Sequence, residues 1–257
     1  MTKVRNTVSD TLVLARRSIL RIRRQPDLLV GFTIQPVMFV LLFVYVFGGA
    51  IQTPGFEYVD FLMPGIIVQS MAFGGFVTAL GLAEDLKKGL IDRFRSLPMS
   101  RAAVVTGRIL ADVGTNIVQL VVMIGVGLAV GFSFSTGVLK VIAGIALLLL
   151  IGYAFSWVFA FIGLTASSPE ASNAYGFTIL FPLTFVSSAF VPVESMPSWL
   201  ESFAEHNPFT TMVDAMRALF LGTPAGSDVW ASVVWSVGIV AVFGPLSVWR
   251  YRRAVTR

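Results

Sequence analysis

The sequence contains no cysteine and a single histidine, and only 13% of its 257 residues are charged. The absence of cysteine excludes disulfides, thiolate metal sites and thiol nucleophiles. Ordinary globular chains carry about 25% charged residues. A 56% hydrophobic composition exceeds what a soluble core of this size can absorb, because surface positions outnumber buried ones. The low content of charged residues and the high content of hydrophobic residues together predict a polytopic membrane protein.

The sequence also lacks the short motifs of familiar enzymes. It has no H-E-x-x-H and no G-x-S-x-G, and without a Gly-Lys dipeptide it has no phosphate-binding loop. The lone histidine, His206, has no second ligand nearby, so we expect no metal site and no catalytic residue. A proton- or ion-coupled carrier normally shows several ionisable groups deep in the membrane, and only Asp112 qualifies. A permease driven by another subunit, a channel or scaffold, or an enzyme with an unrecognised site remain open.

Six helical spans of about 20 residues would use roughly 120 residues. The remainder is scattered in short pieces, so no soluble catalytic domain of ordinary size fits. The first apolar run is too long for a signal-peptide core and lacks a cleavage pattern, so we expect it to stay as an anchor. We predict one all-α transmembrane domain over 1–257, with six spans at 28–50, 61–83, 109–132, 138–164, 174–191 and 229–249.

The charges predict the orientation of these spans. Of the 19 Lys and Arg residues, 17 precede the first span, lie between the second and third, or follow the last. The segments 51–60 and 193–228 are acidic by comparison. The positive-inside rule then places both termini in the cytoplasm, which makes this a multi-pass protein of the plasma or inner membrane. The net charge of +5 reflects topology, so we expect no nucleic-acid partner.

Three other segments are amphipathic. Basic residues line one side of 8–27, which predicts an interfacial helix or a basic flank that is only incidentally helical. The segment 84–98 mixes charges with an apolar ridge that includes Leu86 and Leu90. That pattern suits docking into a groove of a partner, or a solvated face that rests on lipid or on neighbouring spans. The segment 197–221 predicts two short helices that enter the outer leaflet and return, or a plain interfacial loop.

Several polar residues lie within the predicted spans. Asp112, Asn116 and Gln119 occur at i, i+4 and i+7 and therefore share one helix face. A carboxylate at mid-membrane costs about 2.5–3.5 kcal/mol on insertion scales. The stripe faces the bundle interior or a substrate path, or else Asp112 is wetted at the inner boundary or paired with Arg108. The residues that we assign to a path are Gln35, Asp112, Asn116, Gln119 and Thr178.

Four motifs occur in order over nearly the whole chain. They are Gln35–Phe43 with the following Phe47-Gly48-Gly49, Tyr58–Gly65, Glu84–Pro98, and His206-Asn207-Pro208-Phe209. Together they resemble the ABC-2-type permeases, and within these the daunorubicin-resistance permease subgroup. The resemblance implies six spans per subunit and a second permease, either a copy or a sibling. It also implies two separate ATPase subunits, which would carry the ATP and Mg.

The same resemblance assigns roles to particular segments. The loop 84–98 would be the coupling helix that docks on the ATPase, through Glu84, Asp85, Lys87, Lys88, Gly89, Leu90, Asp92, Arg93 and Phe94. The segment 197–221 would be a re-entrant pair at the outer face, with a gate formed by Trp199, Phe203, His206, Asn207, Pro208 and Phe209. The N-terminal basic helix would connect along the inner interface.

The expected function is therefore export of hydrophobic or amphipathic compounds, with drug or antibiotic efflux as the default substrate class. Export of a lipid or glycolipid is the alternative within the same class. A stand-alone channel or an ion-coupled secondary transporter is the alternative from a different class. Membrane lipids would surround the protein in each case.

Overall fold

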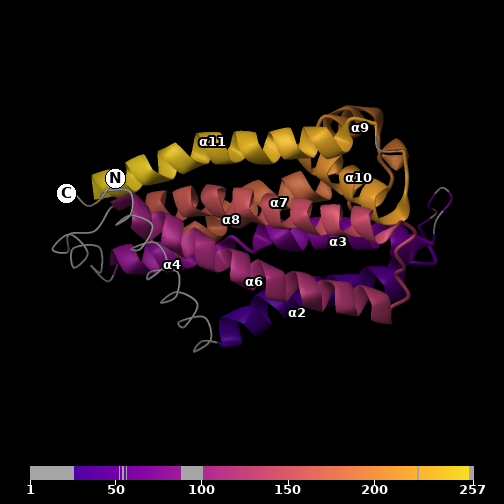
Figure 1. Ribbon diagram of the computed structural model, residues 1–257, viewed down its shortest axis with the longest axis horizontal. Helices are drawn as coiled ribbons and strands as arrows, with labels where there is room; N and C mark the ends of the chain where they lie inside the picture. The colour runs from indigo at the N-terminus through magenta and orange to yellow at the C-terminus, as the bar shows by residue number, and fades with distance from the viewer. Residues whose placement is uncertain are drawn as a thin grey trace.

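The computed structural model describes residues 26–51, 53, 55, 57–87, 101–224 and 226–254. All regular elements in this part of the chain are helices. Most run side by side along the long axis, whereas α9 and α10 gather at one end (Figure 1). The helices are α2 (Pro26–Leu42) with the π-helical η1 (Phe43–Phe47), α3 (Tyr58–Phe73), α4 (Phe76–Lys87), α6 (Arg101–Ala129), α7 (Val138–Thr165), α8 (Pro169–Phe185), η2 (Val193–Ser195), α9 (Ser198–Glu205), α10 (Pro208–Leu221) and α11 (Asp228–Ala254).

Four helical segments among the described residues are long and apolar enough to cross a membrane. They are Tyr58–Lys87, Val105–Ala129, Val138–Thr165 and Asp228–Arg253. They coincide with the second, third, fourth and sixth predicted spans, so the prediction of an all-helical membrane protein is confirmed. The first and fifth predicted spans, 28–50 and 174–191, overlap α2–η1 and α8. The described apolar part of α2–η1 (Ile34–Phe47) and the 17-residue α8 are shorter.

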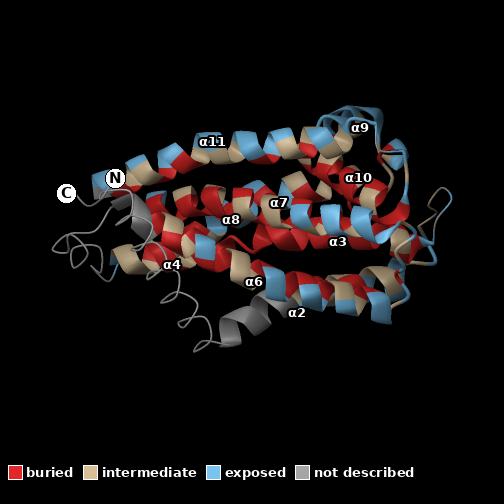
Figure 2. Cartoon of the chain, in the orientation of Figure 1, coloured by how far each residue is buried: buried red, intermediate tan, exposed pale blue. Residues whose placement is uncertain are grey.

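The centre of the bundle is α7, which packs against α3, α4, α6, α8, α10 and α11. Every residue of α3 except Asp60 is buried, and Figure 2 shows α3 and α10 as the most enclosed helices. By contrast, only 17% of the apolar window of α11 is buried within the chain. An apolar helix that is exposed over most of its surface suits contact with lipid, so the bundle has a protein-facing core and a lipid-facing rim.

The second predicted span, 61–83, is not one continuous helix. It breaks at Gly74 and Gly75, which separate α3 from α4. A side chain at Gly74 would collide with the Asn116 amide, and one at Gly75 would collide with the Phe159 ring. The two glycines therefore allow α6 and α7 to approach the backbone closely at this point. The sequence pattern missed the break because the residues on both sides of it are apolar.

The fifth predicted span also ends earlier than expected. The helix α8 stops at Phe185, and a non-helical turn follows up to η2. Pro182 lies in the last turn of α8, where its missing N–H removes one helical hydrogen bond. The predicted pair at 197–221 corresponds to α9 and α10. The predicted interfacial helix 8–27 lies outside the described residues up to residue 25, and α2 begins at Pro26.

Close packing between α4 and α7 gives a stability prediction. A Cβ at Gly163 of α7 would clash with the Ala79 backbone of α4, whereas a Cβ at Gly238 of α11 would meet nothing within 4 Å. We expect Gly163→Ala to destabilise the protein by about 1–3 kcal/mol, the usual cost of overpacking, although alanine favours helix. Gly238→Ala is the matched control and should leave the midpoint of thermal unfolding in detergent unchanged or raised. Equal midpoints for both variants would contradict this packing.

Candidate functional site

The three residues of the α6 stripe all face the interior. Asp112, Asn116 and Gln119 are buried, with exposed fractions of 2%, 1% and 7%. The Thr78 hydroxyl of α4 donates a hydrogen bond to Asp112 Oδ2. A buried carboxylate is tolerated only where such partners replace water. Of the two interpretations of the stripe, the structure therefore favours the one that faces the bundle interior.

Asn116 lies against the break between α3 and α4. Its side-chain oxygen is close to Gly74 and its amide nitrogen is close to Gly152 of α7. Neither polar atom of this buried amide has a hydrogen-bond partner among the described residues. A buried amide without partners costs about 1–3 kcal/mol. Such a group is a candidate ligand for a polar atom that enters the bundle at the helix break.

The other two assigned path residues lie elsewhere. Gln35 lines a small cavity between α2 and α3 together with Gln69 and Phe73. The volume of this cavity is only about 10 Å³. That is the space of roughly one water molecule, so the cavity formed here by the described residues is too small for a drug-sized compound. Gln69 Nε2 donates to Thr184 Oγ1 of α8 at 3.1 Å. Thr178 is exposed on α8 and is not brought together with the α6 stripe.

The C-terminal turns of α4 are attached to α6 through Arg108. Its Nη1 donates to Asp85 Oδ2 at 3.2 Å, and its Nη2 donates to the Val77 carbonyl at 3.2 Å. The guanidinium also occupies the space above Gly81, where any side chain would collide with it. Arg108 pairs with Asp85 in this way and also acts electrostatically on Asp112, one turn further along α6.

Only the first part of the predicted coupling segment is described. Glu84, Asp85 and Lys87 lie in the last turn of α4, which continues the helix further than the predicted span. The remaining assigned residues lie outside the described part of the chain, and they are Lys88, Gly89, Leu90, Asp92, Arg93 and Phe94. Asp85 thus connects the start of this segment to α6 through Arg108.

At the opposite end, Asn207 connects two helices. Its Nδ2 donates to the carbonyls of Leu183 and Val186 at 2.7 and 2.6 Å, which satisfies the open end of α8. Its Oδ1 accepts from the N–H of Phe209 at 2.9 Å and so caps α10. Pro208 occupies the first position of α10, where proline is favoured. Asn207 of the His-Asn-Pro-Phe motif therefore has a structural role, because it connects the end of α8 to the start of α10.

The same end contains a buried cation. Arg217 of α10 is 6% exposed. Its Nη2 donates to the carbonyls of Phe61 and Ser188 at 3.0 and 2.6 Å. Its Nη1 pairs with Asp214 at 2.7 Å, and its guanidinium stacks on the Phe61 ring at 3.6 Å. Burial lowers the pKa of Arg217 and Asp214 opposes that shift, so the group stays charged.

The residues that the sequence predicts to form an outer gate divide into an exposed set and a buried set. Trp199 and Phe203, one turn apart on α9, are 74% and 54% exposed. His206 is also exposed, and its Nδ1 lies 2.8 Å from the Ser202 carbonyl. Phe209 is buried and its ring contacts Phe155 of α7, with ring centroids 5.3 Å apart. The exposed aromatic face of α9 suits the membrane–water interface, whereas Phe209 belongs to the core.

Sequence reasoning did not identify Arg217, Thr78 or the role of Arg108. Arg217 carries a signal, because it is the one base in the otherwise acidic segment 193–228. An isolated arginine among apolar helical residues is typical of a buried, paired group. No comparable signal marks Thr78, because its partner Asp112 is 34 residues away.

The long apolar helices and the polar groups buried between them are those of a polytopic membrane protein. The sequence pattern of the ABC-2 type transporter family matches residues 9–221, and the chain belongs to this family. It is 36% identical over 245 residues to the daunorubicin resistance ABC transporter permease protein DrrB1 of Streptomyces coeruleorubidus. The match covers 95% of this chain and 87% of that relative.

Two further relatives are more distant. The probable doxorubicin resistance ABC transporter permease protein DrrC of Mycobacterium tuberculosis is 27% identical, over 97% of this chain and 90% of the relative. The probable multidrug ABC transporter permease YbhR of Escherichia coli is 23% identical, over 79% of this chain and 55% of the relative. This chain is therefore a membrane-embedded ABC-2 permease similar to those of drug-resistance exporters, as the sequence motifs predicted.

The Arg217 cluster gives a second stability prediction. Arg217→Gln removes the hydrogen bonds to two buried carbonyls, and bonds from charged groups contribute about 1.5–3 kcal/mol each. We expect the unfolding midpoint in detergent to fall strongly. Arg252→Gln at the exposed opposite end removes the same charge and should change it little. A midpoint for Arg217→Gln equal to that of Arg252→Gln would show that the cluster does not stabilise this end of the bundle.

Proposed function

We propose that this chain is the permease subunit of an ATP-binding-cassette exporter that moves hydrophobic or amphipathic compounds out of the cell. The observation that carries the proposal is the match to a permease named for daunorubicin resistance, over 95% of this chain. A drug or antibiotic is therefore the first substrate class to test. The predominantly apolar interior, with a few polar side chains, suits an amphipathic substrate.

The energy would come from a separate subunit. The sequence has no phosphate-binding loop, so ATP and Mg would be bound by an ATPase partner rather than by this chain. The partner would dock on the segment 84–98 at the cytoplasmic face, where the basic residues place it. A second permease, identical or related, would complete the membrane part. The six-span topology and the re-entrant arrangement of α9 and α10 belong to this proposal.

The contacts around Arg108 support a route from the docking segment into the bundle. A displacement of the α4 end would act on α6 through Asp85 and Arg108. Further along the same two helices, Thr78 meets Asp112, and Asn116 meets the break at Gly74. A helix break next to a polar side chain is a natural hinge, because its main-chain angles can change without loss of helical hydrogen bonds.

Dependence on the ATPase tests the proposed function. We expect proteoliposomes with the permease and its phosphate-loop ATPase subunit to transport daunorubicin in the presence of ATP and Mg. Replacement of the phosphate-loop lysine of that subunit should abolish transport, because hydrolysis drives the cycle. Transport by the permease alone under a proton gradient would overturn the proposal. Transport of a fluorescent lipid, but not of the drug, would instead identify the lipid exporter.

The Arg108 connection gives a coupling prediction. Arg108→Gln and Asp85→Asn each remove the ion pair between α4 and α6, and we expect each to lower drug transport per ATP hydrolysed several-fold. The double variant should be no worse than Arg108→Gln alone, because that substitution already breaks the ion pair with Asp85. Lys140→Gln, at the exposed start of α7, is the control. Unchanged coupling ratios in correctly inserted variants would show that the ion pair transmits nothing.

A further inference from the structure

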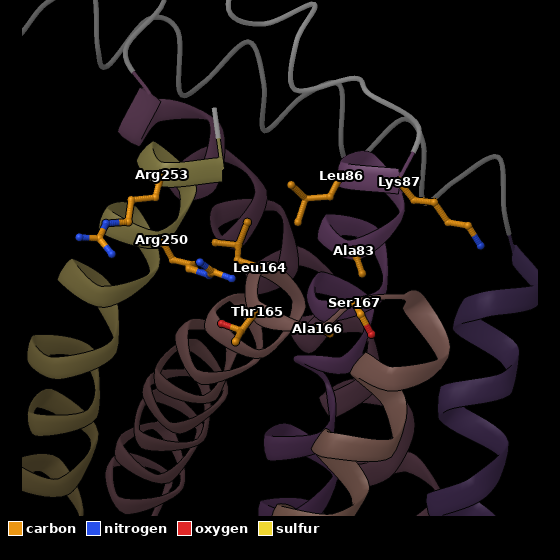
Figure 3. Close-up of a pocket in the computed structure, with 9 residues that line it drawn as sticks. All are labelled: Ala83, Leu86, Lys87, Leu164, Thr165, Ala166, Ser167, Arg250 and Arg253. Atoms are coloured by element: carbon orange, nitrogen blue, oxygen red, sulfur yellow. The ribbon is translucent and has the colours of Figure 1, made fainter. Parts of the chain in front are cut away.

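A pocket of about 390 Å³ opens where α4, α7 and α11 end together. Its apolar wall includes Leu86 and Leu164, and the turn between α7 and α8 contributes Ser167. Figure 3 shows Arg250 directed from α11 across the pocket toward the end of α7. Lys87 and Arg253 extend at its two opposite edges. The pocket therefore combines an apolar wall with three cationic side chains.

Among the residues that the structure describes, none of those that line this pocket is acidic. The Nε of Arg250 is buried and has no hydrogen-bond partner among the described residues. Glu170, at the start of α8, interacts electrostatically with Lys87. The pKa of Glu170 is lowered first by a hydrogen bond with Ser168 and to a smaller extent by Lys87. An N–H donor buried without a partner is costly, so the pocket has an unmet requirement for an acceptor, preferably an anion.

The depth of the pocket in the membrane narrows the choice of anion. The apolar spanning segments end at Lys87, Thr165 and Arg253, so the pocket lies where the hydrocarbon region gives way to headgroups. Trp249 is half exposed at this level, and the Arg253 guanidinium stacks on its ring at 4.2 Å. Tryptophan and arginine at helix ends are typical of the membrane interface. This is the end that bears the basic residues, hence the inner leaflet by the positive-inside rule.

We propose that this pocket binds the phosphate of an anionic phospholipid from the inner leaflet. The phosphate oxygens would accept hydrogen bonds from Arg250, with Lys87 and Arg253 closing from the two edges. The glycerol and upper acyl region would contact Leu86 and Leu164. Basic pockets between membrane helices at the cytoplasmic face are suited to such headgroups. A bound lipid would connect the ends of α4 and α11 beside the start of the docking segment.

Binding to the purified chain tests this proposal independently of transport. Protein delipidated in detergent is incubated with dioleoyl phosphatidylglycerol or with dioleoyl phosphatidylcholine, and bound lipid is counted by native mass spectrometry. We expect retention of phosphatidylglycerol over phosphatidylcholine. In the triple variant with Lys87→Gln, Arg250→Gln and Arg253→Gln, the preference should fall at least about tenfold, since each cation near the surface adds to the attraction.

Arg252→Gln is the matched control, because it removes the same charge from the same helix turn outside the pocket, and it should change the preference less than about twofold. The unfolding midpoint of each variant shows whether it is folded. If the triple variant is misfolded, the single variant Arg250→Gln is tested in its place. An equal loss in the control and the triple variant would overturn the site.

Two further arms distinguish other ligands. Millimolar inorganic phosphate that displaces phosphatidylglycerol completely, and that binds alone with the same dependence on Arg250, would identify a soluble phosphate site and overturn the lipid assignment. A triple variant that keeps its lipid preference but no longer copurifies with the ATPase subunit would identify a protein-docking contact instead. Lipid retention that depends on Arg250 and resists phosphate supports the proposal.

Discussion

The hydrogen bonds that Arg217 and Asn207 donate to main-chain carbonyls hold together the end of this protein that contains α9 and α10. The chain leaves the helical conformation after Phe185 and becomes helical again at α9 and α10. In an apolar environment every carbonyl exposed by such a break needs a donor. Asn207 supplies it at the end of α8, and Arg217 supplies it at Ser188 and at Phe61 of α3. The aromatic core, including Phe209, packs around this polar framework.

The opposite half, which contains α4 and the first turns of α6, is organised differently, because its polar groups link two separate helices. Arg108 links the last turns of α4 to α6 through Asp85, and Thr78 links the same helices through Asp112. Asn116 continues this line to the Gly74–Gly75 break, without partners for its amide among the described residues. Among the described residues, the polar groups of Arg217 and Asn207 have hydrogen-bond partners, whereas the amide of Asn116 has none. This is the arrangement expected of one fixed end and one deformable end. That contrast is consistent with a proposed drive from the cytoplasmic side.

The proposed coupling segment and the proposed lipid pocket share the end of α4. Lys87 belongs to the pocket, and Asp85 of the same turn belongs to the ion pair with Arg108. A headgroup held between α4 and α11 would therefore act on the same helix end as an ATPase partner. The lipid composition of the inner leaflet and the position of α4 would then be linked through one helical turn. This connection follows from the position of the pocket and requires no additional domain.

The sequence by itself determined the class of the protein, its family, and the starts of the fourth and sixth predicted spans, which lie within one residue of the starts of α7 and α11. Apolar length, charge bias and short motifs are local properties, so they can be read without knowledge of the fold. The tertiary structure alone decided that the second span breaks at Gly74, that Arg108 pairs with Asp85, and that Asn207 joins α8 to α10. It also brought Lys87 and Arg250 to one pocket although 163 positions separate them. Each of these features depends on which helices become neighbours. Contact with lipid does not select the neighbours, because almost any apolar helix face can contact lipid equally well. Packing between helices in the interior selects them.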